Sequence, residues 1–205
     1  MPVLIHPDTE LRFVNATIGY GVIATRPIPR GTITWVRDEL DQSFSHERLL
    51  SLPPLHRATL DKYGFLDGTG AHILCWDHAR FVNHACAATC LSAGWDFELA
   101  VRDIAVGEEL SDDYGTLNLV EPFACSCGDA ACRRTILPDD MDRHGDTWDA
   151  LARAAILLIP EVAQPLWPLV REQAEVEAAA AGRGDIPTIR RHDARWRLRE
   201  VAGAR

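Results

Sequence analysis

The first hundred residues are dominated by short stretches whose apolar and polar positions follow the period of a strand rather than a helix. Alternation with a period of two, and enrichment in Val, Ile, Thr and aromatic residues, are typical of half-buried β-strands. A more helical pattern is broken by Pro53-Pro54 within residues 45–62. We predict strands over residues 11–14, 22–25, 32–36, 72–76 and 95–101.

The strand pattern stops after residue 137, and residues 147–181 are rich in Ala, Leu, Ile, Val and Glu. We predict two or three helices there, one starting near Thr147 as its N-cap and another over 170–181. Residues 150–159 are apolar almost all round, so we expect them to pack against the rest of the chain. The pattern as a whole predicts a β-rich α+β fold with a helical C-terminal extension.

The net charge of the protein limits the kinds of molecule that it is expected to bind. The net charge of −9 does not indicate direct nucleic-acid binding, but a negative surface would tolerate a basic peptide or protein. Residues 183–205 are an exception, with seven Arg against three acidic residues. We interpret this tail as an amphipathic helix that folds back on the acidic body; contact with a peptide, nucleic acid or partner is the alternative.

Two targeting signals are missing from the sequence. No apolar run approaches the roughly 20 residues of a membrane span, and the N-terminus lacks a basic region followed by an apolar one. We therefore expect no membrane association and a cytoplasmic protein. The sequence carries no indication of the oligomeric state.

Six cysteines are present, and three of them are spaced Cys-x-Cys-x4-Cys at Cys125, Cys127 and Cys132. Clustered cysteines in a chain without an export signal indicate metal ligands before disulfides. Tetrahedral zinc takes four ligands. The fourth would come from elsewhere in the chain, and the candidates are Cys86, Cys90 and, more weakly, His84.

Three further stretches carry chemistry-bearing residues. They are the Gly19-Tyr20-Gly21 turn, the Arg80-Phe81-Val82-Asn83-His84-Ala85-Cys86 run and the Gly107-Glu108-Glu109-Leu110-Ser111-Asp112-Asp113-Tyr114 run. Glycines let a backbone approach a ligand closely, but no phosphate-binding Gly-x-x-Gly follows, which disfavours a doubly wound nucleotide fold.

Together with the cysteine cluster, these stretches resemble the SET-domain family of protein lysine methyltransferases, including its zinc-binding post-SET segment. The family order is Gly-x-Gly, Arg-Phe-x-Asn-His-Ser-Cys-x-Pro-Asn, Gly-Glu-Glu-Leu-x-x-Asp-Tyr and then Cys-x-Cys-x4-Cys. The resemblance covers roughly residues 10–137. It implies a SET-domain fold with a pseudoknot over residues 1–120, a post-SET zinc knuckle over 121–137 and a helical extension over 138–205.

The resemblance also implies site residues. Tyr114 would be the catalytic tyrosine, and Cys86 would join Cys125, Cys127 and Cys132 on a structural Zn²⁺. Tyr63 and Trp76 are candidate channel walls, with plain core packing as the alternative. S-adenosylmethionine would bind at Gly19, Tyr20, Gly21, Arg80, Asn83, His84 and Tyr114.

The implied function is S-adenosylmethionine-dependent methylation of the lysine side-chain amine in a protein or peptide. The sequence departs from the family at Ala85, Ala88 and Thr89, where Ser, Pro and Asn are usual, and at Asp112, where an aromatic residue is common. The missing Asn would remove a hydrogen-bonding side chain near the cofactor. A SET-fold module that binds cofactor or peptide without turnover, and a purely structural zinc protein, are the alternatives.

Overall fold

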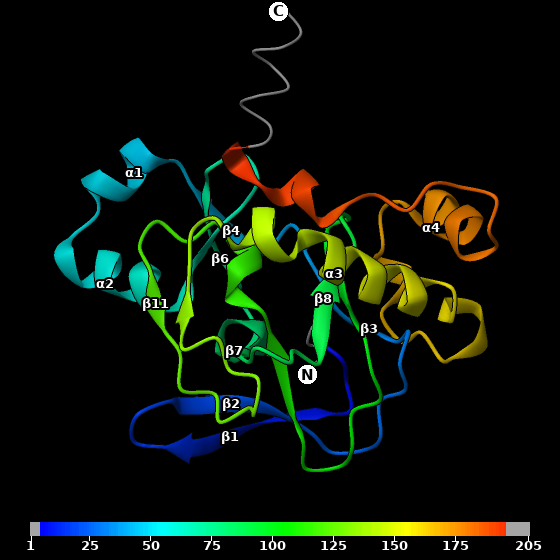
Figure 1. Cartoon of the computed structure of the whole chain (residues 1–205). Helices are drawn as coiled ribbons and strands as arrows, with labels where there is room; N and C mark the ends of the chain where they lie inside the picture. Colours follow the sequence, from blue (N-terminus) through cyan, green and yellow to red (C-terminus); the bar gives the residue numbers. More distant parts are fainter. Residues whose placement is uncertain (1–4, 196–205) are drawn as a thin grey trace, which may run out of the picture.

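The computed structural model describes residues 5–195, which form four small sheets with helices around them (Figure 1). The sheets have the strand orders β1-β2-β10-β7, β3-β9-β8, β4-β6-β5 and β11-β12. The strands are β1 Thr9–Asn15, β2 Gly19–Ala24, β3 Ile33–Val36, β4 Gln42–Phe44, β5 Phe65–Leu66, β6 His72–Leu74, β7 Asn83–His84, β8 Cys90–Ser92, β9 Phe97–Ala100, β10 Glu109–Asp112, β11 Phe123–Ala124 and β12 Thr135–Ile136.

Helices flank the sheets on two sides. In Figure 1, α1 and α2 lie together at one edge, whereas α3 and α4 cross the opposite part of the molecule. The α-helices are α1 His46–Ser51, α2 Pro54–Tyr63, α3 Asp140–Ile156 and α4 Gln173–Ala180, and the 3-10 helices are η1 His78–Phe81, η2 Tyr114–Thr116, η3 Ile159–Glu161, η4 Trp167–Leu169 and η5 Ile189–His192. None of the described helices is long and apolar enough to cross a membrane.

Strand β10 lies between β2 and β7 and joins three sequence motifs. It pairs antiparallel with β2, where Leu110 lies opposite Val22, and parallel with β7, where Ser111 lies opposite Asn83. Val22 and Leu110 are buried because they enter the same apolar cluster. Segments separated by tens of residues in the sequence therefore meet as hydrogen-bonded neighbours.

The five predicted strands are all present, within one to three residues of their predicted bounds, and the helical stretch broken at Pro53-Pro54 is also confirmed. The Gly-Tyr-Gly segment is different. It was predicted as a turn, but Gly19 already begins β2, and Gly21 pairs with Arg12 inside the hairpin. The turn lies just before it, where the Asn15 side chain accepts hydrogen bonds from the backbone of Thr17 and Ile18.

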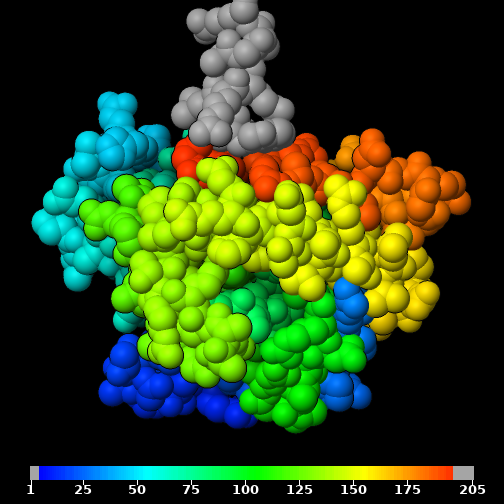
Figure 2. All heavy atoms as spheres, in the orientation of Figure 1, coloured from blue at the N-terminus to red at the C-terminus, as the bar shows by residue number. Residues whose placement is uncertain are grey.

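The C-terminal extension completes the largest hydrophobic core. Met141, Trp148 and Ile156 of α3 pack in one cluster with Phe97 and Leu99 of β9. Figure 2 shows the yellow-to-red C-terminal residues in contact with the green segments below them. The packing expected for residues 150–159 is therefore confirmed on one face, although the opposite face of α3 is exposed. The domain bounds at 120 and 137 stay predictions, but the clustered apolar residues of the extension, as far as residue 195, share one core with residues of β3, β8 and β9.

The predicted start of the first C-terminal helix at Thr147 is wrong. Helix α3 begins at Asp140, so Thr147 lies within it, and the charged first turns and Gly145 hid the helical pattern. Glycine at position 145 leaves room for the Arg190 guanidinium, which packs over the helix where a Cβ would otherwise lie. The second helix, predicted over 170–181, is confirmed as α4.

The described part of the basic tail, residues 183–195, folds back on acidic residues, and the helix predicted for the tail falls largely on residues outside the described part. Residues 189–192 form the short 3-10 helix η5, and Arg190 pairs with Asp146 of α3 at 2.8 Å. Arg195 pairs with Asp193 at 2.9 Å and with Asp142 of α3 at 3.6 Å. The remainder of the tail, including Trp196 and Leu198, lies outside the described residues.

Two adjacent side chains test whether α3 is part of the core. Ile156 is fully buried, whereas Leu157 is 50% exposed. We expect Ile156→Ala to lower the free energy of unfolding by about 2–5 kcal/mol, and Leu157→Ala by at most about 0.5 kcal/mol. Denaturant titration measures both. Equal, small losses would mean that the extension is only loosely attached.

Candidate functional site

Asn83 joins the glycine strand to the Asn-His segment. Its side-chain amide donates one hydrogen bond to the Tyr20 carbonyl oxygen at 2.9 Å and another to the Glu109 carboxylate at 2.6 Å. One side chain thus connects β7, β2 and β10. The predicted site residues Tyr20 and Asn83 are therefore direct neighbours, although 62 residues separate them in the sequence.

The two glycines of β2 have different reasons to be glycine. Gly19 has φ +89°, a conformation that side chains with a Cβ rarely adopt, and faces open space, with no atom within 4 Å of where a Cβ would lie. A Cβ on Gly21 would collide with the Glu109 carboxylate that accepts the Asn83 bond. Gly19 leaves its backbone open to a ligand, and Gly21 leaves room for the Asn83–Glu109 contact.

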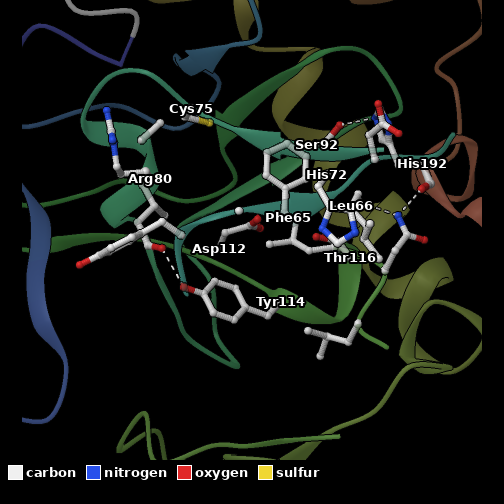
Figure 3. Close-up of a pocket in the computed structure, with 18 of the residues that line it drawn as sticks. Phe65, Leu66, His72, Cys75, Arg80, Ser92, Asp112, Tyr114, Thr116 and His192 are labelled. Atoms are coloured by element: carbon white, nitrogen blue, oxygen red, sulfur yellow. Dashed lines mark hydrogen bonds between the residues drawn. The ribbon is translucent and has the colours of Figure 1, made fainter. Parts of the chain in front are cut away.

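Tyr114 follows β10 and points into a pocket (Figure 3). Its hydroxyl donates to the Val82 carbonyl oxygen at 2.9 Å. Burial, and then the nearby charges of Asp112, Glu109 and Glu98, raise the pKa of Tyr114. The phenol is therefore neutral at ordinary pH, so it can position a group by hydrogen bonding but is a poor proton acceptor.

His84 connects Tyr114 to the cysteine cluster. Its Nδ1 accepts the backbone N–H of Tyr114 at 3.1 Å, and its Nε2 lies 3.4 Å from Cys86 Sγ. Burial lowers the pKa of His84, which favours a neutral ring with the proton on Nε2. The rings of His84, Tyr114 and Phe123 lie 5.4–6.0 Å apart, so both ring nitrogens and the ring face have partners within the protein.

Arg80 lines the same pocket, but its guanidinium is bonded to the backbone. It donates to the carbonyl oxygens of Asp77, at 3.0 Å, and Trp76. These bonds fix the 3-10 helix that leads into β7. Of the two candidate channel walls, Tyr63 lines the pocket, and Trp76 is not among the described residues that do.

The four thiols of Cys86, Cys125, Cys127 and Cys132 lie within 4.8 Å of one another. Cys125 Sγ lies 3.6 Å from Cys132 Sγ and 3.8 Å from Cys86 Sγ. Four ligands about 2.3 Å from a tetrahedral metal would be about 3.8 Å apart. The cluster could therefore hold a metal ion, with Cys86 as the member from outside the Cys-x-Cys-x4-Cys run.

Backbone amides point at three of these sulfurs. The N–H groups of Cys127, Arg133 and Arg134 donate to Cys125, Cys86 and Cys132 respectively, each at 3.4 Å. Such donors stabilise thiolates, which is the form that binds metal. Cys90, the other sequence candidate, lies in the hydrophobic cluster with Val22 and Leu110 and is away from the four.

Thr89 replaces the family's Asn with a different hydrogen-bonding residue. Its side chain is 1% exposed, and its hydroxyl accepts the Ser111 N–H at 2.7 Å. The Thr89 N–H in turn donates to the Ser111 carbonyl oxygen at 3.1 Å. The segment after Cys86 is thus anchored to β10 by Thr89, and the loss of a hydrogen-bonding side chain near the cofactor stays a prediction.

The pocket under Tyr114 has a volume of about 580 Å³. Aromatic side chains form much of its wall, and six acidic residues line it against three basic ones. Helix η5 of the extension contributes Ile189 and His192, and His192 Nε2 lies 3.0 Å from Ser92 Oγ. The aromatic and acidic residues of the lining are Trp35, Tyr63, Phe65, Trp95, Phe97, Tyr114 and Phe123, and Asp61, Asp67, Asp96, Glu98, Asp112 and Glu121.

Two carboxyl groups of the pocket lie close enough to influence each other's charge. Asp112 is 4% exposed, and its carboxyl group interacts electrostatically with that of Glu98. Burial raises the pKa of Glu98 to about 7. Burial and the neighbouring charges of Glu98 and Asp113 raise the pKa of Asp112 well above its usual range. Because like charges this close oppose double ionisation, the pair holds a proton at neutral pH.

Sequence reasoning missed Glu98, Phe123 and His192 as pocket residues. Glu98 lies in the strand predicted over residues 95–101, and the apolar alternation that predicts this strand does not indicate that Glu98 meets Asp112. His192 lies in the tail, for which the excess of Arg predicts contact with acidic residues but no place in a pocket. Only the sheet registers and the path of the extension bring these residues to the pocket.

Residues 19–115 match the family model described as SET domain. This match confirms the resemblance to the SET domain and the β-rich fold, whereas the post-SET zinc-binding segment stays a prediction.

Relatives match over short stretches. The chain is 40% identical over 63 residues to histone-lysine N-methyltransferase trithorax of Drosophila virilis, a match that covers 27% of this chain and 2% of that protein. It is 39% identical over 62 residues to the H3 lysine-4 specific histone-lysine N-methyltransferase of Schizosaccharomyces pombe, which covers 27% and 7%. The chain thus spans a small part of the length of these relatives.

Among solved structures, the methyltransferase domain of human histone-lysine N-methyltransferase SETMAR aligns with a TM-score of 0.44 and 16% identity. The alignment covers 64% of this chain and 58% of that chain.

A double-mutant cycle tests the contact that joins the strands. Gly21→Ala should displace the Glu109 carboxylate from Asn83 and lower the free energy of unfolding by about 1 kcal/mol. Asn83→Ala removes the same bond. We therefore expect the double variant to lose less than the sum by at least about 0.5 kcal/mol in denaturant titrations. Strict additivity would show that Gly21 serves something other than the Asn83–Glu109 bond.

Proposed function

We propose that the protein transfers a methyl group from S-adenosylmethionine to the side-chain amine of lysine in a protein or peptide. The observation that carries this proposal is the match to the SET domain over residues 19–115, whose motif tyrosine points into an acidic, aromatic-walled pocket. The similar regions of trithorax and of the yeast protein, both named histone-lysine N-methyltransferases, support the same reaction.

The residues present fit the cofactor. Gly19 has an open backbone next to Tyr20, and Asn83 fixes the Tyr20 carbonyl. Gly19, Tyr20, Gly21, Arg80, Asn83, His84 and Tyr114 would hold S-adenosylmethionine, with His84 contributing through its backbone because its ring is already engaged. When bound, the cofactor supplies a methyl group on a positively charged sulfur, so the transfer needs no metal.

The pocket suits a cationic side chain. Its acidic residues outnumber its basic ones, and its aromatic walls would enclose the methylene chain of a lysine. A dry, aromatic surrounding lowers the pKa of an amine, and the amine must lose its proton before it can attack. The substrate we propose is therefore a lysine within a basic segment.

Tyr114 would position the amine rather than deprotonate it. Its hydroxyl donates its proton to the Val82 carbonyl oxygen, so the hydroxyl oxygen would act toward the amine as a hydrogen-bond acceptor. Holding nitrogen, methyl carbon and sulfur in line contributes much of the acceleration in a transfer of this kind.

The cysteine cluster would bind one structural Zn²⁺. Its four thiols and three amide donors match the ligand number and charge that zinc requires. Arg133, next to Cys132, also pairs with Asp113 and with Asp140 of α3. The metal would thereby hold the segment with Phe123 against the pocket.

Metal content tests this arrangement. We expect one zinc per chain in the purified protein and its loss in Cys127→Ser, measured by elemental analysis. Cys90→Ala is the matched control and should keep one zinc, because Cys90 lies in the apolar core. Zinc retained in Cys127→Ser, or lost only in Cys90→Ala, would contradict the ligand set.

Methyl transfer tests the reaction. Wild-type protein with labelled S-adenosylmethionine should label lysine residues of lysate proteins, identified by mass spectrometry. Tyr114→Phe removes only the hydroxyl and should reduce the rate by about 10²-fold, with zinc content and the unfolding midpoint as folding controls. Equal rates would mean that Tyr114 is not part of catalysis. No transfer by a wild type that still binds the cofactor would favour a binding module.

A further inference from the structure

We propose that the Glu98–Asp112 carboxyl pair receives the substrate's cationic amine in the pocket and accepts one of its protons. The inference rests on the proposed function and adds to it the group that makes the amine neutral. Tyr114 does not fill this role, because its own hydroxyl is protonated and bonded to Val82.

The registers of two sheets bring the carboxyl groups together. Glu98 of β9 pairs with Trp35 of β3 and with Ser92 of β8. Side chains of paired antiparallel residues project to the same face, and all three line the pocket. Asp112 enters from the end of β10, two residues before Tyr114. In Figure 3, the side chains of Asp112 and Tyr114 both project into the pocket.

The pair has the charge needed to accept a proton. With one proton shared between two carboxyl groups, it carries about one negative charge, which an ammonium group would neutralise. Asp112 is buried and Glu98 is half-buried, so a cation is attracted more strongly there than in water. An acceptor that titrates near neutral pH is also well suited to proton transfer at that pH.

The neighbouring titratable groups do not replace the pair. Asp113 is bonded to Arg133, and the Arg80 guanidinium is bonded to backbone carbonyls. Burial raises the pKa of the two nearby thiols, so these stay protonated. The titratable groups that interact electrostatically with the pair from the surrounding elements are Cys75, Cys90, Asp113 and Tyr114.

Proton transfer precedes methyl transfer. The lysine ammonium nitrogen gives one proton to a carboxylate oxygen of the pair and keeps the electron pair of the broken N–H bond. That electron pair forms the new N–C bond, while the electrons of the S–C bond stay on sulfur. The product leaves as a lysine whose side-chain ammonium carries one methyl group, and the carboxyl pair then releases its proton to solvent.

The pH dependence of methyl transfer is the main test. The substrate is a mixture of synthetic peptides that each carry one central lysine. Wild-type kcat/KM should rise to a plateau above about pH 7, where the pair can accept a proton. The double variant Glu98→Gln/Asp112→Asn should be about 10²-fold slower at pH 7.5. Its rate should keep rising toward the amine's own pKa, near 10.4.

Carbon NMR of the Glu98 and Asp112 carboxyl groups supplies a readout that needs no turnover. Adding n-butylammonium, the lysine side-chain analogue, should shift both resonances, and the uncharged n-butanol should not. Glu161→Gln, an exposed change on η3, is the charge-matched control and should behave as wild type. If Asp112→Asn does not fold, Glu98→Gln alone is compared.

The outcomes separate the two proposals. If wild type and the double variant transfer methyl with the same pH profile, the carboxyl pair is not the acceptor, although the proposed function stands. If n-butylammonium shifts neither resonance, or n-butanol shifts them equally, the pair does not receive a cation. If n-butylammonium shifts both but wild type transfers no methyl, the proposed function fails while the cation site stands.

Discussion

The site depends on the pairing of β10 with β2 on one side and β7 on the other. This pairing brings together a glycine strand, an Asn-His segment and an acidic strand that ends in Tyr114. Asn83 reinforces it by bonding to both Tyr20 and Glu109. Because parallel β7 and β10 each contribute only two paired residues, the side-chain bonds of Asn83 and His84 carry much of the local order.

Two further parts of the structure complete the pocket around this sheet. On one side, His84 and Cys86 lead to the cysteine cluster and to Phe123, which returns to the pocket. On the other, the strands β3, β9 and β8 present Trp35, Glu98 and Ser92 to the same pocket and bury their opposite face against α3. The C-terminal extension thus both completes the core and, through His192, lines the pocket.

Much of this could be predicted from the sequence because it is local. Strand periods, the Cys-x-Cys-x4-Cys spacing and the order of the motifs are properties of short stretches, and the structure brings Cys86 to the other three thiols as the family pattern implied. The contact between Glu98 and Asp112 depends on the register of two sheets, which no local pattern encodes. The start of α3 at Asp140 was hidden because tertiary contacts, here with Arg190 over Gly145, stabilise a helix whose first turns are polar.

Calorimetric titration with S-adenosylmethionine tests the central claim most directly, namely that the β2–β10–β7 arrangement forms a cofactor site. The account predicts binding of one molecule per chain to wild-type protein and strongly weakened binding to Asn83→Ala, which frees the Tyr20 carbonyl but leaves the cysteine cluster intact. Absence of binding to folded, metal-loaded wild type, or equal affinity for the variant, would contradict it.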